Sequence, residues 1–341
     1  MCLCARIIDA STNCLVFTQL PDLAAERLGG AVLAANDEFF APKEALLKPT
    51  KPEWREGVYT ERGKWMDGWE TRRRRDPGYD WAIVRLGLAG IVRGVVIDTS
   101  YFTGNYPEEA SIDGCGLEGT PSTALLTSAD VEWFPLLAPT KLAGNAANPI
   151  EVISNHRVTH LRLNIFPDGG VARLRVHGEA VPDRRVFAAN REVDLAAIEN
   201  GGHVIACSDM HYGNPQNLLM PGRSTHMGDG WETKRRRGPG HDWTVVRLAR
   251  RGSIERIELD TDHFKGNAPG RVMLESADIP DLDAFEATLA DWRQIVPEQA
   301  VEPHARHRFD DLKGGAATHL RLNIYPDGGV ARLRVFGHVP P

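Results

Sequence analysis

Acidic and histidine side chains that could act as general acids or bases recur in two parts of the chain at matching intervals. Carboxylates and imidazoles are the usual agents of proton transfer in enzyme sites. The candidates for catalysis are Asp67, Glu70, Asp229, Glu232, His241 and Asp260. The sequence Asp-Gly-Trp-Glu holds the first two and returns at the next two. Such a corner either takes part in catalysis or orders a loop by accepting hydrogen bonds from backbone amides, and the sequence leaves both roles open.

Arginine and amide side chains in the same segments could bind an anion that carries amide groups. Arginine recognises a carboxylate through two parallel N–H donors, and an asparagine amide offers both a donor and an acceptor. The candidates for substrate binding are Arg73, Arg74, Asn105, His160, Arg162, Arg235, Arg236, Asn267, His319 and Arg321. The two histidines in this set precede strands and have a structural alternative, because a lone histidine is more often structural than catalytic.

A metal site would need the histidines that occur only in the second half to converge on nearby carboxylates. These residues are His211, His241 and His263, with Asp209, Asp229 and Asp260. No HExxH-type spacing supports such a site. The sequence therefore predicts no required cofactor and leaves a divalent metal open.

Other residues of these segments are predicted to be structural. Large aromatic residues dominate core burial, which assigns four tryptophans to cores: Trp69, Trp81, Trp231 and Trp243. Pro-Asp-Gly-Gly is typical of a turn, so Asp168 and Asp327 are poor catalytic candidates. Alternation with apolar residues predicts a solvated strand face for four arginines: Arg173, Arg175, Arg332 and Arg334. Residues 72–75 are predicted to alternate sides of a strand, with at least one pair forming ion pairs to nearby acidic residues.

The chain contains the same unit twice. Residues 67–86 recur as 229–248 with 15 of 20 positions identical, and residues 159–178 recur as 318–337 with 18 of 20. Weaker matches join 98–105 to 260–267 and 30–40 to 202–212. A duplicated unit fixes domain boundaries better than composition does. We expect an N-terminal segment at 1–19, a first repeat at 20–180, a linker at 181–187 and a second repeat at 188–341.

The elements that must position these residues are short β-strands. Strand patterns cover residues 81–86, 94–102, 160–166 and 171–178, separated by turn sequences. Leu161, Leu163 and Ile165 alternate with polar residues, as in a half-buried strand, and the Pro-Asp-Gly-Gly that follows predicts a hairpin. Helix signals are few, for example at 281–292. The pattern predicts an all-β fold, with two tandem jelly-roll β-sandwiches.

Composition limits the function classes. A length of 341 residues suggests two domains, and no apolar stretch is long enough to span a bilayer. Residues 1–20 lack the order of a signal peptide. The five cysteines match no zinc or redox spacing and indicate free thiols in a reducing compartment. A net charge of −6 argues against a nucleic-acid partner. We therefore expect a cytoplasmic protein that binds neither nucleic acid nor membrane.

The repeated motifs resemble the allantoicase family: D-G-W-E-T-x-R-R-R, D-T-x-x-F-x-G-N and H-L-R-L-N-I-x-P-D-G-G-V-A-R-L-R-V, over about residues 27 to 338. The resemblance implies two jelly-roll domains of the galactose-binding type. It also implies hydrolysis of allantoate to ureidoglycolate and urea in allantoin and purine degradation, with arginine holding the substrate carboxylate. We expect a homo-oligomer. Tyr79 stands where the second repeat has His241, and residues 38–40 differ from 210–212, which leaves open the repeat that supplies each part of the site.

Three other functions compete with this assignment. Paired jelly rolls often bind carbohydrates or other ligands through loops without catalysis. A nucleic-acid binder would use the two arginine-rich runs, but aromatic residues are rarely interleaved with them. Another amidohydrolase of ureide metabolism, acting on ureidoglycolate, is the alternative within the enzyme class.

Overall fold

The computed structural model describes residues 17–188, 191–279, 291–313 and 315–340. Two compact units divide the chain, one comprising Leu20–Val181 and the other beginning at Pro182. Each unit is a β-sandwich of the jelly-roll type, so the chain is all-β with an internal duplication, as predicted. The predicted helix at 281–292 falls mainly outside the described residues. No described helix is long and apolar enough to cross a membrane.

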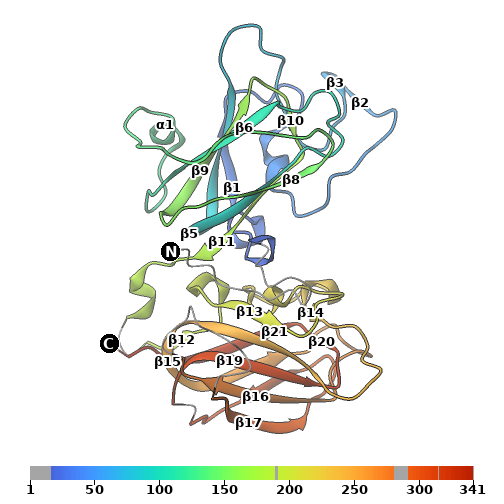
Figure 1. Cartoon of the computed structure of the whole chain (residues 1–341), viewed down its shortest axis with the longest axis vertical. Helices are drawn as coiled ribbons and strands as arrows, with labels where there is room; N and C mark the ends of the chain where they lie inside the picture. The colour runs from blue at the N-terminus through green and yellow to red at the C-terminus, as the bar shows by residue number, and fades with distance from the viewer. Residues whose placement is uncertain (1–16, 189–190, 280–290, 314, 341) are drawn as a thin grey trace. The chain divides into compact units, whose positions relative to one another are not determined.

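The two units share the order of their main strands but differ in several short elements (Figure 1). The elements of the first unit are η2 (Glu26–Leu28), β1 (Ala31–Ala35), η3 (Lys43–Leu47), β2 (Tyr59–Thr60), β3 (Gly63–Lys64), β4 (Trp69–Glu70), β5 (Asp80–Asp98), β6 (Glu109–Cys115), α1 (Thr123–Leu126), β7 (Phe134–Lys141), β8 (Ala147–Glu151), β9 (Arg157–Phe166), β10 (Gly170–Val171) and β11 (Arg173–Ala180). The elements of the second are η4 (Arg184–Phe187), β12 (Val193–Asp194), η5 (Ile198–Asn200), β13 (His203–Cys207), η6 (Pro215–Leu219), η7 (Met227–Asp229), β14 (Trp231–Glu232), β15 (Asp242–Asp260), β16 (Arg271–Ala277), β17 (Arg293–Ala300), β18 (Arg306–Phe309), β19 (Ala316–Tyr325), β20 (Gly329–Val330) and β21 (Arg332–His338). A further short helix, η1 (Phe17–Gln19), precedes the first unit.

One long strand serves as the spine of each unit. In the first unit, β5 pairs with β1 and β9 over residues 80–85 and with β11 and β8 over residues 90–98, and the pairing with β9 continues at residues 90 and 91. A register shift separates the two halves, so β5 exchanges its neighbours midway. β15 does the same in the second unit. The two strands predicted at 81–86 and 94–102 are therefore one continuous strand that ends at Asp98.

The predicted hairpin between residues 160–166 and 171–178 is wrong. β9 pairs with β5 along one edge and with β6 along the other, which leaves no edge for the strand that follows the turn. After the turn, β10 instead pairs with β4, and β11 pairs with β5. The turn therefore leads the chain to other partner strands and does not fold it back against β9 as a hairpin.

The core lies on the inner face of β9, as the alternation predicted. Leu161, Leu163 and Ile165 are fully buried. The outer face is only partly exposed, because a second apolar cluster of Ile83, Cys115, Leu126 and Val131 packs on this side of the sheet. Leu126 and Val131 come from the segment around α1.

The four tryptophans assigned to cores separate into two classes. Trp69 and Trp231 are completely buried, which confirms the prediction for them. Trp81 and Trp243 are partly buried and pack against the outer clusters of their units.

Among the described residues, Cys115 and Cys207 are the free thiols. Burial raises the pKa of Cys115 to about 11 and that of Cys207 to about 12. Both therefore stay protonated near neutral pH and are poor nucleophiles. The three N-terminal cysteines lie outside the described residues.

The solvated face predicted for the arginines of β11 and β21 is wrong for Arg173 and Arg332, which are 2 % and 3 % exposed. The Arg173 guanidinium forms an ion pair with Asp67, Nη2 to Oδ2, at 2.5 Å, and donates to the Asp67 carbonyl at 2.9 Å and the Thr50 carbonyl at 3.0 Å. Arg332 pairs with Asp229 at 2.8 Å. The face is buried because η3 and the chain after it pack across β11.

The Asp67–Arg173 pair is expected to stabilise the first unit. Arg173→Met leaves a buried carboxylate without its main partner, which costs about 3–5 kcal/mol. Urea unfolding followed by tryptophan fluorescence measures the loss. Arg73→Met is the matched control, since Arg73 is exposed. A loss for Arg173→Met no larger than that of the control contradicts this role for the pair.

Candidate active site

The structure brings together Glu70 and Asn105, two candidates from separate motifs. Asn105 Nδ2 donates to Glu70 Oε1 at 2.7 Å. The same pair recurs in the second unit, where Asn267 Nδ2 donates to Glu232 Oε1 at 2.6 Å. A polar contact that both repeats retain indicates a common ancestral arrangement.

Three features fix the position of the Glu70 carboxyl. Glu70 ends β4, which pairs with β10, and the preceding Trp69 donates its indole N–H to the Asp37 carbonyl at 2.8 Å. The Asn105 carbonyl accepts the Gly170 N–H at 2.7 Å, which ties the Asn105 loop to β10. Gly170 has to be glycine, because a Cβ there would lie 2.0 Å from the Phe102 ring.

Burial controls the charge state of Glu70, a residue that is only 9 % exposed. Removal from water raises the pKa of the carboxyl, and the hydrogen bond from Asn105 opposes part of that rise. The net effect is an upward shift. A carboxyl whose pKa is raised keeps its proton to higher pH and is better suited to donate it to a leaving group.

Glu70 and Asn105 line a pocket of about 210 Å³, here named the glutamate pocket. This volume is below the roughly 300–1,000 Å³ of pockets for drug-sized ligands, and it suits a small polar metabolite. The other lining residues are Phe40, Trp54, Lys64, Met66, Tyr101 and Thr103. Lys64 Nζ lies 3.9 Å from the Trp54 ring centroid, and Trp54 stacks on Tyr101 at 5.9 Å. One carboxyl, one amide and one cation therefore share a partly aromatic pocket.

Sequence reasoning missed Trp54, Lys64 and Tyr101. The first two belong to the segment between Leu47 and Asp67, which contains β2 and β3. The corresponding segment of the second unit, between Leu219 and Asp229, is shorter and has no counterpart of that hairpin. The extra length of this segment in the first repeat is therefore the sequence signal that could have identified Trp54 and Lys64.

The surroundings of Glu232 differ accordingly. Asn267 Nδ2 also lies 3.2 Å from Met227 Sδ, which comes from the shorter segment. His263 stands at the position of Tyr101 in the alignment of the repeats. The Glu–Asn pair is thus duplicated, but the wall that Trp54 and Lys64 form beside it is not.

Three further carboxylates predicted to be catalytic lie elsewhere. Asp67 and Asp229 are the acidic partners of the buried arginines. Asp260 lies 3.3 Å from Arg306 Nε and accepts the Asp262 N–H at 2.8 Å. Each of these three carboxylates makes contacts that hold a loop in place.

The predicted ion pairs of the run 72–75 are present, although these residues lie outside regular strands. Arg72 pairs with Asp37 at 2.6 Å, and Arg74 pairs with Asp80 at 2.7 Å. Arg236 pairs in the same way with Asp242 in the second unit. Arg73 and Arg235 are exposed, and no hydrogen bond or ion pair joins either to the described residues.

Arg162 belongs to a separate polar cluster on the outer face of β9. Its Nη2 lies 2.9 Å from Asp113 Oδ2, which also accepts from Asn164 Nδ2 at 2.9 Å.

The second unit repeats this cluster with Glu275. Arg321 Nη2 lies 2.5 Å from Glu275 Oε2, and Asn323 donates to the same oxygen at 2.8 Å. His241 joins the cluster, with Nε2 at 3.0 Å from Asn323 Oδ1. His241 therefore lies with Arg321 and is not part of the Glu232–Asn267 pair.

His160 and His319 are almost completely buried, at 1 % and 0 % exposed. Each Nδ1 lies within hydrogen-bond distance of the preceding threonine hydroxyl, at 2.8 Å and 2.9 Å. Burial is the main cause that lowers both pKa values, to about 4 for His319. Neutral, buried imidazoles cannot touch a ligand in this conformation, so we leave both out of the proposed site.

Among the described residues, no three or more His, Cys, Asp or Glu side chains are arranged to hold a metal ion. His241 faces Asn323, and His263 Nε2 lies 3.0 Å from the Ser224 carbonyl oxygen. These two histidines therefore do not converge on the carboxylates that the metal hypothesis requires.

The hydrogen bond between Asn105 and Glu70 generates a test of the site electrostatics. We expect the pKa of Glu70 to lie above its ordinary value of 4.5 and to rise further in Asn105→Ala, because burial persists while the donor is lost. Carboxyl ¹³C NMR titration, assigned with Glu70→Gln, measures both values. Asn267→Ala is the matched control. An unchanged or lower Glu70 pKa in Asn105→Ala would show that the hydrogen bond from Asn105 does not stabilise the ionised carboxylate.

Comparison with known proteins now gives the family. Residues 21–181 and 193–340 each match the allantoicase repeat. A probable allantoicase of Pseudomonas paraeruginosa is 48 % identical over 326 residues, covering 94 % of this chain and 96 % of that protein. One of Photobacterium profundum is 47 % identical over 331 residues, covering 95 % and 98 %. The crystal structure of allantoicase from Saccharomyces cerevisiae superposes with a TM-score of 0.76 at 36 % identity, covering 94 % and 93 %. The chain belongs to the allantoicase family.

Proposed function

We propose that this chain hydrolyses allantoate to ureidoglycolate and urea, a step of allantoin degradation in purine catabolism. Two family repeats and relatives of high identity over nearly the whole chain support this reaction. The single structural observation that carries the assignment of the site is the buried Glu70–Asn105 pair facing the glutamate pocket. A cytoplasmic location and a homo-oligomeric state stay predictions from the sequence.

The chemistry of allantoate sets the requirements. Its central carbon carries a carboxylate and two ureido groups, and one ureido nitrogen must leave with its electron pair. That nitrogen needs a proton so that urea departs as a neutral molecule, and water must add to the carbon. A cation is needed for the carboxylate. The glutamate pocket contains a candidate for each role.

Glu70 is proposed to act first as the general acid and then as the general base. Asn105 bonds to Oε1, which leaves Oε2 to carry the proton. This proton passes to the leaving nitrogen as the carbon–nitrogen bond breaks, while the lone pair of the remaining ureido nitrogen forms a carbon–nitrogen double bond. Water then adds to the carbon and returns a proton to Glu70. The raised pKa of Glu70 favours the protonated form that begins this cycle.

Lys64 is the proposed partner of the substrate carboxylate. Its ammonium lies at the rim of the pocket against Trp54, and the candidate Arg74 is already paired with Asp80. Trp54 and Tyr101 form an aromatic wall that keeps water from the reacting carbon and strengthens the attraction between the opposite charges. The ureido carbonyl and amide groups are left for Asn105 and Thr103.

The first unit is the proposed location of the working site. Glu232 and Asn267 repeat the central pair, but the second unit lacks the insertion that supplies Trp54 and Lys64. The proposed contacts of Lys64 and Trp54 with the substrate therefore have no counterpart beside Glu232. We therefore assign one catalytic pocket to each chain.

Glu70→Gln is expected to lower kcat for urea release from allantoate by about 10²–10⁴-fold, since the amide cannot transfer the proton. Glu232→Gln, the same change in the second unit, is expected to leave kcat within about twofold. Coupled assay of urea release from purified full-length protein measures both. Equal losses in the two variants would refute the assignment to one unit, and a fully active Glu70→Gln would refute the role of Glu70.

Lys64→Met is expected to reduce kcat/KM for allantoate by about 10–100-fold, which corresponds to roughly 1.5–3 kcal/mol for a charge-assisted hydrogen bond. The effect should weaken in high salt, because the pair is accessible to ions. Lys51→Met, which removes an exposed lysine outside the pocket lining, is the control. If both variants keep the wild-type kcat/KM, the carboxylate is held by another cation.

A further inference from the structure

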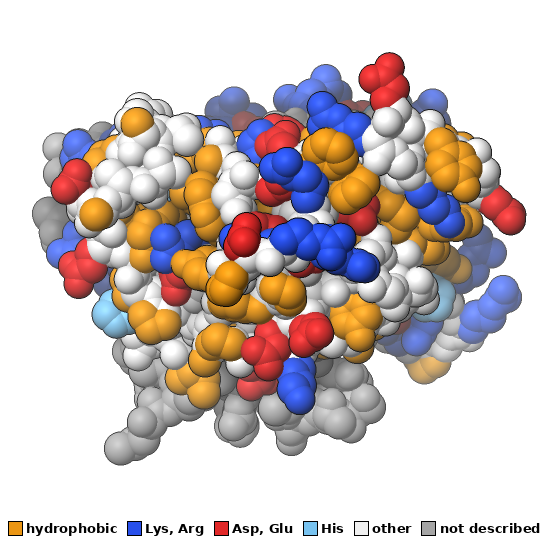
Figure 2. Space-filling model, turned by 90° about the horizontal axis from the view of Figure 1, so that it is seen from above, with side chains coloured by type: hydrophobic (Ala, Val, Ile, Leu, Met, Phe, Trp, Pro, Cys, Tyr) orange, Lys and Arg blue, Asp and Glu red, His pale blue; other side chains and the backbone are white. Residues whose placement is uncertain are grey.

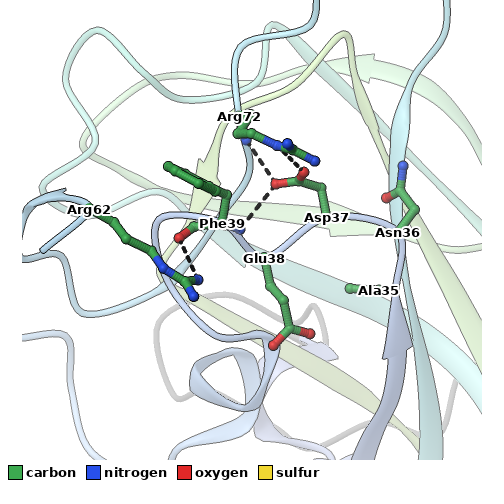
Figure 3. Close-up of a pocket in the computed structure, with 7 residues that line it drawn as sticks. All are labelled: Ala35, Asn36, Asp37, Glu38, Phe39, Arg62 and Arg72. Atoms are coloured by element: carbon green, nitrogen blue, oxygen red, sulfur yellow. Dashed lines mark hydrogen bonds and ion pairs between the residues drawn. The ribbon is translucent and has the colours of Figure 1, made fainter.

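A second pocket of about 260 Å³ lies next to the glutamate pocket in the first unit (Figure 3). It is lined by Ala35, Asn36, Asp37, Glu38, Phe39, Arg62 and Arg72, and is here named the arginine pocket. Phe39 lines this pocket and Phe40 lines the glutamate pocket. Their rings meet edge to face at 5.0 Å and form the wall between the two. None of the lining residues takes part in the proposed hydrolysis.

Two guanidinium groups from separate segments approach Phe39 in this pocket (Figure 3). The Cζ atoms of Arg62 and Arg72 each lie 5.4 Å from the Phe39 ring centroid. Arg62 donates from Nη1 to the Phe39 carbonyl at 3.0 Å. Arg72 donates from Nε to Asp37 Oδ2 at 2.6 Å. The Nη groups of Arg72 stay available, so the pocket offers guanidinium donors that can address one ligand from two directions.

Asp37 holds this arrangement in place. Its Oδ1 accepts the Arg72 N–H at 3.0 Å and the Phe39 N–H at 3.1 Å. Burial would raise the pKa of Asp37, but the two backbone donors and the Arg72 guanidinium outweigh it and lower the pKa. Asp37 is therefore ionised and its oxygen atoms are engaged. It orients Arg72 without closing the pocket to an anion.

Arg62 is the cation of the pocket that is available to an anionic ligand. Asp37 offsets Arg72, and Lys43 is shared between Glu38 at 3.0 Å and Glu44 at 2.7 Å. No acidic side chain among the described residues forms an ion pair with Arg62. Its guanidinium can therefore pair with a carboxylate brought by a ligand. On the face of the molecule shown in Figure 2, basic, acidic and hydrophobic side chains are interspersed.

The second unit shows which of these residues the loop needs for folding. Asp209 repeats the role of Asp37, accepting the Lys234 N–H at 2.8 Å and the His211 N–H at 3.1 Å. Lys234 replaces Arg72, His211 replaces Phe39, and Arg62 has no counterpart. Lys234 pairs with Asp209 at 3.3 Å, and His211 meets Tyr212 edge to face at 4.5 Å, so the loop uses a cation and an aromatic ring in both units. Arg62 and the second row of donors on the Arg72 guanidinium are what the first unit adds, and the stability of the loop does not explain them.

The geometry points to a second ligand site: the arginine pocket binds a small ureido carboxylate, with Arg62 on the carboxylate and the Nη groups of Arg72 on the ureido carbonyl oxygen. The ligand class rests on the proposed function, because the substrate and the product of that reaction carry both groups. Arginine is suited to this task because its planar fork makes two parallel bonds to a carboxylate.

N-carbamoylglycine is the test probe, since it has one carboxylate and one ureido group and cannot release urea by the proposed route. Calorimetric titration is run on full-length protein carrying Lys64→Met, which removes the cation of the glutamate pocket. In this background we expect one remaining site. Arg62→Gln and Arg72→Lys should each weaken it at least about tenfold, whereas Arg73→Gln should not. Arg72→Lys copies the residue of the second unit, so the loop is expected to keep its fold.

Two results would overturn the inference. One is that Lys64→Met alone abolishes binding of N-carbamoylglycine, which would place the ligand in the glutamate pocket only. The other is that Arg62→Gln and Arg72→Lys bind it as tightly as the background protein does. Urea release by the wild-type chain is measured separately. If urea is released but binding of N-carbamoylglycine does not depend on the two arginines, the second site is refuted and the proposed function stands. If N-carbamoylglycine binds through the arginines but no urea is released, the proposed function is refuted and the second site stands.

Discussion

The buried ion pair between the first residue of Asp-Gly-Trp-Glu and the arginine of the last long strand is the constraint on which each unit depends. Asp67 and Arg173 are separated by more than half of the first unit in sequence, yet they meet at 2.5 Å. This contact fixes the corner that begins at Asp67, and Glu70 follows within that corner. An exposed pair would contribute little, whereas a buried one admits few alternative geometries. The corner that carries the proposed general acid is therefore held in place by residues that also stabilise the fold.

Duplication separates what both units share from what only the first unit has. The ion pair, the Glu–Asn pair and the aspartate that orders the neighbouring loop are present in both units. The β2–β3 insertion is confined to the first. It places Lys64 in the glutamate pocket and Arg62 in the arginine pocket, on either side of the wall that Phe39 and Phe40 form. One short hairpin thus accounts for most of the chemical difference between two similar sandwiches.

The parts of the fold that depend on local pattern could be predicted, and those that depend on distant packing could not. Alternation identified the core face of β9 at Leu161, Leu163 and Ile165. It could not show that η3 covers the arginines of β11, nor that β9 has no free edge for a hairpin. Comparing the repeats selected Glu70 and Asn105. The same comparison overlooked Lys64, because it retains only the residues that both repeats share.

The long strand β5 has a consequence for the way the first unit moves. β9 pairs with both halves of β5, whereas β1 and β11 each pair with one half, so separating any of these strands breaks hydrogen bonds along one common backbone. The strands should accordingly open together, as a single cooperative block. Residues 54–66 are mostly exposed and make few such bonds, so they can open at a much smaller free-energy cost. The sandwich thereby confines local opening to the segment that forms the rim of both pockets, and ligand exchange need not disturb the core.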